Sequence, residues 1–233
     1  MISFVKADSP DNGIKTLAEE IGSRLVKGEK VSWLVSGGSN IPISVRVMKA
    51  VRAGVEGDPI SSLTVALTDE RFGPVGHKDS NWKQLEDAGF DFSGVEAVAV
   101  LPRSDLGMNP TLNEAVSNYS KNVMAAMTNA DFIVAQFGIG ADGHIAGILP
   151  GSPAAASKEF VCAYEVSPFK RITLAFPALR KIDTAYAFVF GESKEEAMGR
   201  LRDAARGKSN ETLEKLPSLV LNEMRKAVVY SDQ

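Results

Sequence analysis

The chain has 233 residues, and 44% of them are hydrophobic, which is enough to bury a full core. Its 26 basic and 29 acidic residues give a net charge of -3, so no overall field would draw it to nucleic acid or to an anionic membrane. The only cysteine, Cys162, excludes an internal disulfide, and no Cys and His spacing typical of a metal site occurs. The N-terminal residues lack the basic and apolar regions of a signal peptide, so we expect a cytoplasmic protein.

Apolar residues at helical spacing between Ile14 and Leu25 predict a first helix that ends near Gly28. Short apolar runs then predict buried strands, and helical segments lie between most of them. The strands are expected at 31–35, 63–67, 95–101, 131–137 and 184–190, and the helices at 42–51, 81–88, 112–127 and 194–205. This alternation predicts an α/β fold with a doubly wound, mainly parallel sheet and helices on both faces.

Two further runs, at 160–166 and 171–176, have no helix between them and predict an antiparallel or peripheral element. No repeat, low-complexity tract or linker divides the chain, so we expect a single domain over residues 1–233. A strand-like run also starts within a few residues of Met1, so we expect no DNA-binding segment before this domain.

Polar clusters follow four of the predicted strands. They are SGGSN after Val35, TDER after Leu67, GIGADGH after Phe137 and GESK after Phe190. Open α/β sheets bind ligands at the carboxyl ends of their strands, where loops, helix N-termini and backbone amides converge. All four clusters are therefore expected at one edge of the sheet, as parts of one site.

The first cluster is a glycine-rich turn between a strand and a helix, with Pro42 near the first turn of that helix. Backbone amides, hydroxyl groups and the positive end of a helix together favour an anion, and a phosphate is the natural occupant. The residues expected to bind it are Ser36, Gly37, Gly38, Ser39 and Asn40. The alternative is a plain tight turn with Asn40 as the helix N-cap. A Walker loop is excluded because the Gly-Lys-Ser/Thr ending is missing.

In the second cluster, Asp69, Glu70 and Arg71 come directly after a buried strand. Arg71 could present a planar fork of donors to a phosphate or a developing oxyanion, with the acids holding it in place. The alternative is a solvated charged loop. His77, in the same segment, is expected to be a surface residue rather than a catalyst.

The third cluster matches the pattern GxGxxG, with Glu165 at about the spacing of a ribose-binding acid. Pro150 and Pro153 leave too little room for the crossover helix of a dinucleotide-binding unit, so this interpretation is disfavoured. We instead expect a turn that aims His144 at a ligand, with Asp142 orienting its ring. A histidine can take a proton from water near neutral pH. A histidine that merely caps the turn is the alternative.

Five motifs in this order, SGGSN, DERFGP, GIGADGHIAGILPG, RITL and GESK, resemble the 6-phosphogluconolactonase family. The resemblance implies hydrolysis of 6-phosphoglucono-δ-lactone in the pentose phosphate pathway, without metal or organic cofactor. It implies a fold shared with glucosamine-6-phosphate deaminase and ribose-5-phosphate isomerase. It also implies His144, Asp142 and Arg71 as catalytic residues, and Ser36, Gly37, Gly38, Ser39, Asn40, Asp69, Arg171 and Lys194 as substrate-binding residues. The expected partner is a sugar-phosphate lactone, with no nucleic acid or membrane, and the protein is expected to be a monomer or a small homo-oligomer.

The chain departs from the family pattern at several positions. Asn40 and Ile41 precede Pro42 where the family has Thr, and Ala175 follows RITL where Thr is frequent. Ile145 and Gly147 replace two hydroxyl residues after the histidine. Which arginine meets the phosphate and which the carbonyl stays open.

Two alternative functions remain. The related deaminases also carry D-G-H-I-A, but their catalytic Glu corresponds to Leu149, and an aliphatic side chain cannot move a proton. A sugar-phosphate sensor or an inactive relative would keep the phosphate groups but need no base.

Overall fold

The computed structural model describes residues 2–55, 57–102 and 109–233. Seven strands form the central sheet: β1 (Ile2–Lys6), β2 (Val31–Val35), β3 (Leu63–Leu67), β5 (Glu96–Val98), β6 (Phe132–Phe137), β9 (Thr184–Val189) and β10 (Lys226–Ser231). Their spatial order is β1-β10-β9-β6-β2-β3-β5, and every neighbouring pair is parallel. The predicted parallel sheet is thus confirmed.

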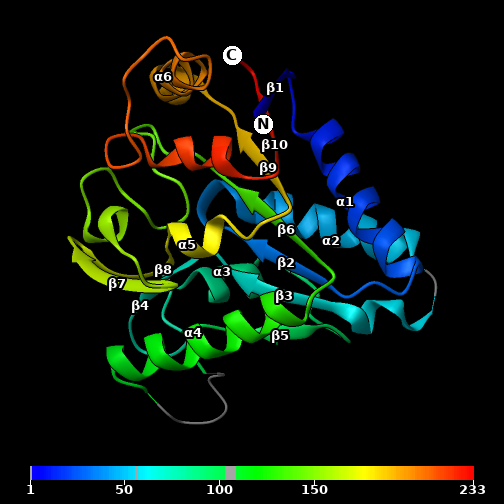
Figure 1. Cartoon of the computed structure of the whole chain (residues 1–233). Helices are drawn as coiled ribbons and strands as arrows, with labels where there is room; N and C mark the ends of the chain where they lie inside the picture. Colours follow the sequence, from blue (N-terminus) through cyan, green and yellow to red (C-terminus); the bar gives the residue numbers. More distant parts are fainter. Residues whose placement is uncertain (1, 56, 103–108) are drawn as a thin grey trace.

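Helices follow most of the strands, and the order of the strands decides which face each helix covers. They are α1 (Asp11–Val26), α2 (Ile41–Gly54), α3 (Asn81–Asp87), α4 (Leu112–Asn129), α5 (Phe176–Leu179) and α6 (Glu195–Ala205). The chain passes from β1 at one edge through β2 and β3 to β5 at the other edge, and then returns through β6, β9 and β10. Because the crossovers are right-handed, this reversal of direction places the helices of the two halves on opposite faces. Figure 1 shows α1 and α2 on one side of the sheet and α4 on the other. No helix in the described ranges is long and apolar enough to cross a membrane.

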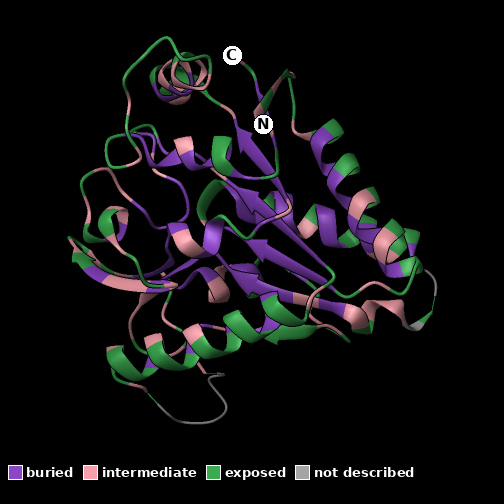
Figure 2. Cartoon of the chain, viewed as in Figure 1, coloured by how far each residue is buried: buried purple, intermediate pink, exposed green. Residues whose placement is uncertain are grey.

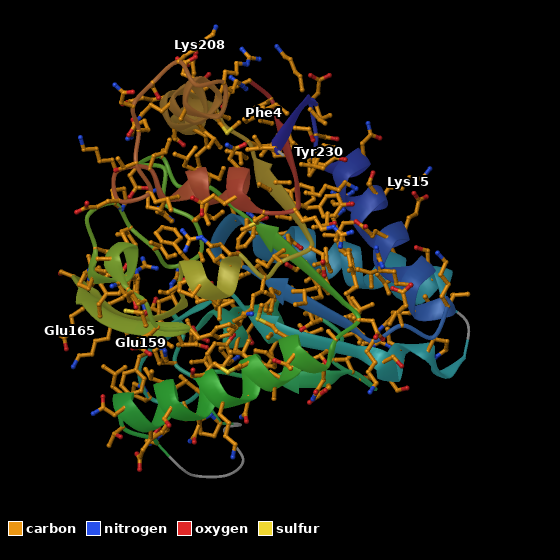
Figure 3. All side chains as sticks on the ribbon, viewed as in Figure 1. Phe4, Lys15, Glu159, Glu165, Lys208 and Tyr230 are labelled. Atoms are coloured by element: carbon orange, nitrogen blue, oxygen red, sulfur yellow. The ribbon has the colours of Figure 1, made fainter. Side chains whose placement is uncertain are left out.

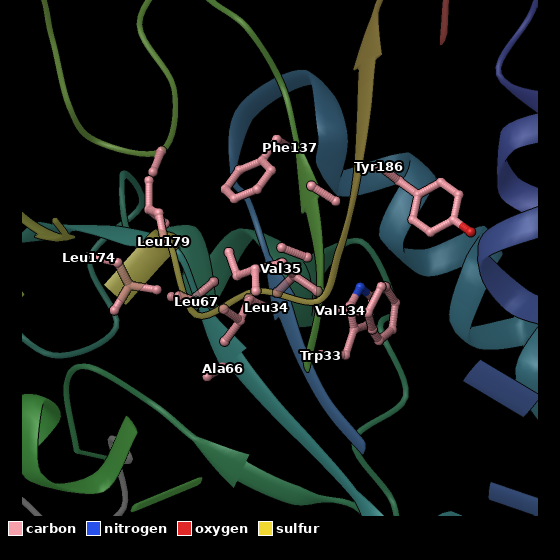
Figure 4. Packing of buried hydrophobic residues seen from close by; sticks show 14 of the residues in the cluster. Trp33, Leu34, Val35, Ala66, Leu67, Val134, Phe137, Leu174, Leu179 and Tyr186 are labelled. Carbon is pink, nitrogen blue, oxygen red and sulfur yellow. The ribbon is translucent and has the colours of Figure 1, made fainter. Parts of the chain in front are cut away.

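The central strands are fully buried, as their continuous apolar runs predict. Every residue of β2, β6 and β9 is buried (Figure 2). Trp33 of β2 has no exposed surface, and its ring centroid lies 5.6 Å from that of Phe90. Figure 4 shows the packing around Trp33, Val134 and Phe137. This rigid core fixes where the carboxyl ends of the strands lie.

A second, antiparallel sheet lies beside the carboxyl ends. It contains β4 (Asp69–Phe72), β8 (Phe169–Leu174) and β7 (Val161–Val166), in that order. The antiparallel element predicted from the runs at 160–166 and 171–176 is therefore confirmed. The residues Asp69–Phe72 were expected only as a polar cluster after a strand, but they form an edge strand because they pair with β8. This sheet is joined to the main one where Leu174 N donates to Thr68 O at 2.9 Å.

Two details of the main sheet differ from the prediction. The run at 95–101 forms a strand only at Glu96–Val98, and Glu96 and Ala97 are exposed because β5 is the edge strand. The strand β10 was not predicted; it lies between β1 and β9 and completes the sheet on that side.

Candidate active site

The four polar clusters meet at one edge of the sheet, as predicted. They follow β2, β3, β6 and β9, which are parallel, so their carboxyl ends face the same way. Close contacts, described below, link the clusters after β2, β3 and β6 to each other. The site described below is this carboxyl edge together with β4 and β8.

The first cluster, Ser36–Asn40, which we call the anion turn, is shaped by two glycines. A Cβ on Gly37 would lie 2.0 Å from Asn81 Oδ1, so only glycine lets the turn approach that side chain. Gly38 has φ +64°, a left-handed conformation that favours glycine. Gly38 and Ser39 are exposed, whereas Ser36 is buried and its Oγ lies 2.8 Å from Thr68 Oγ1. An anion would therefore meet Gly37, Gly38 and Ser39, with Ser36 supporting them from below.

The side chain of Asn40 connects the anion turn to the segment that follows β6. It is 1% exposed and occupies the N-cap position of α2 without a capping side-chain bond. In the amide orientation that satisfies both of its ends, its nitrogen donates to Phe137 O at 3.1 Å and its oxygen accepts from Gly138 N at 3.3 Å. A Cβ on Gly138 would lie 2.6 Å from the Asn40 side chain, so glycine is required there as well. The Asn40 side chain thus connects the anion turn to the segment after β6 and does not face a ligand.

Arg71 and Arg171 lie directly opposite each other on β4 and β8. Their guanidinium carbons lie 5.3 and 5.8 Å from the centroid of the Phe169 ring. Arg171 Nη1 is 3.6 Å from Asp69 Oδ2, and Arg71 Nη1 donates to Asp79 O at 3.2 Å. Neither Nε atom has a hydrogen-bond partner within the described ranges. The two cations lie side by side with unused donors, which suits an anionic ligand.

The acids of the same strand hold the backbone and Arg171 rather than the Arg71 guanidinium, contrary to expectation. Asp69 pairs with Arg171. Glu70 is fully buried and accepts hydrogen bonds from Ser80 Oγ and from the backbone N–H groups of residues 71, 81 and 82. Burial raises the pKa of Glu70, and these four donors oppose the shift. Glu70 therefore anchors the start of α3 to β4. His77, expected as a surface residue, is half-buried with Nε2 2.8 Å from Arg71 O.

His144 and Asp142 form a hydrogen-bonded pair at the tip of the segment Gly138–His144, which we call the glycine turn. Nδ1 of His144 lies 2.6 Å from Asp142 Oδ1. Burial opposes ionisation of Asp142, but its hydrogen bonds with His144 and the charge of that ring outweigh burial and lower the pKa of Asp142 to about 2. An ionised carboxylate can only accept, so Nδ1 carries a proton in this contact, and in the neutral imidazole Nε2 is then the acceptor. The side chain of His144 is 35% exposed, so that nitrogen can meet a water molecule.

The glycine turn holds this pair through close packing. A Cβ on Gly140 would lie 2.0 Å from His144 Nδ1 and 2.5 Å from Asp142 Oδ1. Gly140 N donates to His144 O at 2.9 Å, and Gly143 N donates to Gly140 O at 3.0 Å. Gly143 has φ +86°, which favours glycine. The sequence pattern predicted a turn here but not the need for glycine at position 140, which depends on the two side chains that fold back over it.

The glycine turn is tied to the second sheet just after His144. Gly147 N donates to Thr173 Oγ1 at 3.0 Å, and Tyr164 Oη donates to Gly147 O at 2.6 Å. Thr68 Oγ1 donates to Asp69 Oδ1 at 3.2 Å, and Asn81 Nδ2 donates to Asp69 O at 2.9 Å. Thr68 and Thr173 were missed as site residues; their only signal was their position inside TDER and RITL. Through these contacts the glycine turn, the arginine pair and the anion turn form one connected unit.

Lys194 ends a short 3-10 helix, Glu192–Lys194, between β9 and α6, and is half-buried. It thus lies on the predicted edge, after the strand that neighbours β6. A groove of about 1240 Å³ lies elsewhere, between α4 and the edge formed by β3 and β5. Alanines, valines and prolines line it together with asparagines, hydroxyl groups, Lys30 and two carboxylates, Glu96 and Glu114, and none of its lining residues is a histidine. The groups able to move a proton near neutral pH gather at the carboxyl edge, so we place the site there.

Residues 6–229 match the family of glucosamine-6-phosphate isomerases and 6-phosphogluconolactonases. The chain belongs to this family. A 6-phosphogluconolactonase of Mycobacterium tuberculosis is 29% identical over 195 residues, which cover 79% of this chain and 77% of that protein. The probable 6-phosphogluconolactonase 1 of Arabidopsis thaliana is 30% identical over 58% of this chain and 54% of its own length. The GDH/6PGL endoplasmic bifunctional protein of Oryctolagus cuniculus is 25% identical over 80% of this chain, but the match spans only 24% of that longer protein.

Solved structures show the same fold. A 6-phosphogluconolactonase from Shewanella baltica superposes with a TM-score of 0.77 and 20% identity, covering 99% of this chain and 98% of that one. A monomeric glucosamine-6-phosphate deaminase superposes with a TM-score of 0.74 and 16% identity, covering 100% of this chain and 97% of that one. The fold therefore does not separate lactonase from deaminase, and the side chains of the site must do so.

Proposed function

We propose that this protein hydrolyses 6-phosphoglucono-δ-lactone to 6-phosphogluconate, the step of the oxidative pentose phosphate pathway after which several of its relatives are named. The observation that carries the proposal is the His144–Asp142 pair, which leaves Nε2 as a free acceptor on a partly exposed ring. Lactone hydrolysis needs a base of this kind, because water must lose a proton as it attacks the carbonyl. The reaction needs no metal or organic cofactor.

In the proposed mechanism the phosphate rests on the anion turn, with Lys194 and one or both of Arg71 and Arg171 supplying positive charge. Binding this remote group positions the ring of the lactone. His144 Nε2 then takes a proton from a water molecule that attacks C1, while Asp142 keeps the imidazole in the required tautomer. His144 returns the proton to the ring oxygen as the C1–O bond breaks.

The oxyanion that forms at C1 needs a donor, and an arginine is the better candidate. Gly140 N and Gly143 N already donate within the glycine turn, and His144 N donates to Asp142 Oδ1 at 3.1 Å. Among the described residues Arg171 makes one ion pair, through Nη1 with Asp69 at 3.6 Å, which leaves other donors of its guanidinium group for a ligand. A preorganised cation aimed at the developing charge is an effective stabiliser of a transition state.

The deaminase activity of the same family is disfavoured by a single side chain. The glutamate that the resemblance implies for deaminases corresponds to Leu149, which is half-buried and packs against the core. No carboxylate is therefore supplied at that position. We further place the activity in the cytoplasm, in line with the single Cys162, in a single-domain protein that acts as a monomer or small homo-oligomer.

The test is hydrolysis of freshly generated 6-phosphoglucono-δ-lactone, followed by proton release above the spontaneous rate. His144→Ala should lower kcat by about 10²–10⁴. His77→Gln is the matched control, because glutamine keeps a donor for Arg71 O, and it should stay close to wild type. Release of ammonia from glucosamine 6-phosphate is measured in parallel. A His144→Ala enzyme as fast as wild type would refute the mechanism, and binding of 6-phosphogluconate without any acceleration would favour a sensor.

A further inference from the structure

The segment Glu211–Ser218, which we call the C-terminal strap, lies against the back of the glycine turn. It follows α6 in the chain, after the loop whose Lys208 points outward in Figure 3. Ser218 N donates to Gly143 O at 3.0 Å, and a Cβ on Gly143 would lie 2.3 Å from Leu216 Cδ1. Leu216 and Ser218 have no exposed surface. The residue between Asp142 and His144 is thus packed directly on the strap.

The strap is also bonded to the chain that leaves the glycine turn. Gly151 N donates to Glu214 O at 2.8 Å. The turn has its own internal bonds, but its Gly143 carbonyl and the following Gly151 amide both face the strap. A displacement of the strap would therefore be transmitted to the backbone that carries Asp142 and His144.

Arg200 of α6 is the side chain that fastens the strap. Its Nε lies 2.7 Å from Glu211 Oε1, and its Nη2 donates to Lys215 O at 3.1 Å. These two contacts hold the strap at its beginning and directly before Leu216. The side chains of Arg200 and Glu211 are 32% and 18% exposed, so the pair is partly shielded from water.

Charge reinforces the contact between Arg200 and the strap. The hydrogen bond with Glu211 raises the pKa of Arg200 despite the opposing effect of burial, and the negative charges of Glu211, Glu196 and Asp142 contribute to the same shift. Arg200 therefore stays a cation, and its guanidinium group keeps its donors for Glu211 and for Lys215 O.

We propose that Arg200 is a positioning residue for His144: it fastens the C-terminal strap, which packs against Gly143, the residue between Asp142 and His144. It touches neither the substrate nor the reacting atoms. This inference rests on the proposed function only for its kinetic test, since the position of the His144 ring can be measured without any substrate.

The central variant is Arg200→Met, which keeps much of the length of the aliphatic side chain but loses the guanidinium donors and their charge. We expect kcat to fall by roughly 10- to 10²-fold, because a displacement of about 1 Å at a catalytic group can cost that much, with KM within about threefold of wild type. Arg200→Lys keeps the charge without the fork and should recover part of the loss. Arg206→Met, which removes the same charge from an exposed position at the end of α6, is the matched control and should keep wild-type kcat.

Two further measurements separate positioning from a general loss of stability. In a double-mutant cycle, Arg200→Met should cause no further loss in a His144→Ala background, because it acts through that ring. The chain has only two histidines, so their ring-proton NMR signals can be assigned by substitution. Arg200→Met should shift the His144 signal and leave that of His77 unchanged, in protein that urea unfolding shows to be folded.

Three results would overturn the inference: equal kcat for Arg200→Met and Arg206→Met, an equal loss in the presence and absence of His144, or an unchanged His144 signal. If wild type does not hydrolyse the lactone, the proposed function fails, and the NMR comparison still decides the inference by itself.

Discussion

Replacement of Gly140 by alanine should remove activity without unfolding the protein. The added Cβ would lie 2.0 Å from His144 Nδ1 and 2.5 Å from Asp142 Oδ1. Carbon and nitrogen atoms in ordinary contact lie about 3.5 Å apart, so the imidazole must move by roughly 1.5 Å. A displacement of this size at the base should lower kcat by about 10²-fold or more.

The effect of Gly140→Ala on stability should be small, because both displaced groups are the ends of partly exposed side chains. Gly140 does not have a positive φ, so alanine fits its backbone, and the reduced entropy of the unfolded chain favours folding by about 0.4–1 kcal/mol. Lactone hydrolysis and urea unfolding should be measured on the same preparations. Gly54→Ala is the control, since its Cβ would meet no atom within 4 Å. A Gly140→Ala enzyme with wild-type kcat would show that the observed contact of His144 with Asp142 is not the catalytic arrangement.

Two more predictions concern the charged groups of the site. Arg171→Ala should raise KM by about 10- to 10²-fold, as expected for loss of about 1.5–3 kcal/mol of charged hydrogen bonding to the phosphate, with a smaller change in kcat. Steady-state kinetics with Arg71→Ala in parallel would tell which arginine serves the phosphate, and an unchanged KM in both would contradict the phosphate site. Asp142→Asn should lower kcat by at least about tenfold, because an amide can hold either tautomer of His144. It should also change the pH dependence of stability. The pKa of Asp142 is lowered from 3.8 to about 2, so its ionised form stabilises the fold above pH 3.8, and this contribution is lost as the pH falls towards 2. In urea unfolding near pH 7, the free energy of unfolding of the wild type should therefore exceed that of Asp142→Asn, and this difference should shrink below pH 3.8. The difference should stay below about 1 kcal/mol, because the side chain of Asp142 is half exposed.

The central sheet could be predicted because its strands are buried on both faces. The continuous apolar runs of β2, β6 and β9 allow no other placement in a chain of alternating strands and helices. The strands at the edges of the two sheets were harder to predict from the sequence. β5 is a short strand with two exposed residues, and Asp69–Phe72 is a strand only because β8 pairs with it. An edge strand depends on a partner that is distant in sequence, and the local pattern of apolar and polar residues does not indicate that partner.

The kinds of residue in the site could be predicted for a similar reason. Polar clusters after buried parallel strands must share one edge, so Arg71 and His144 belong together before any contact is known. The contacts themselves depend on packing in three dimensions. Asp69 pairs with Arg171 rather than Arg71, and Asn40 turns inward towards Phe137 and Gly138. Neither orientation could be read from the order of the residues.

Gly147 shows how a departure from the family pattern is balanced by its surroundings. A Cβ at this position would lie 2.8 Å from Thr173 Cβ and 2.9 Å from Asp69 Cβ, so a serine here would push β4 and β8 away from the glycine turn. With glycine, Thr173 Oγ1 can instead accept from Gly147 N at 3.0 Å, and Tyr164 can donate to Gly147 O. The hydroxyl group of Thr173 thus bonds to the backbone at position 147, close to the space that a side chain there would take. This close approach also places Asp69, and with it Arg171, beside the segment that follows His144, so the packing of β4 and β8 on this segment depends on glycine at position 147.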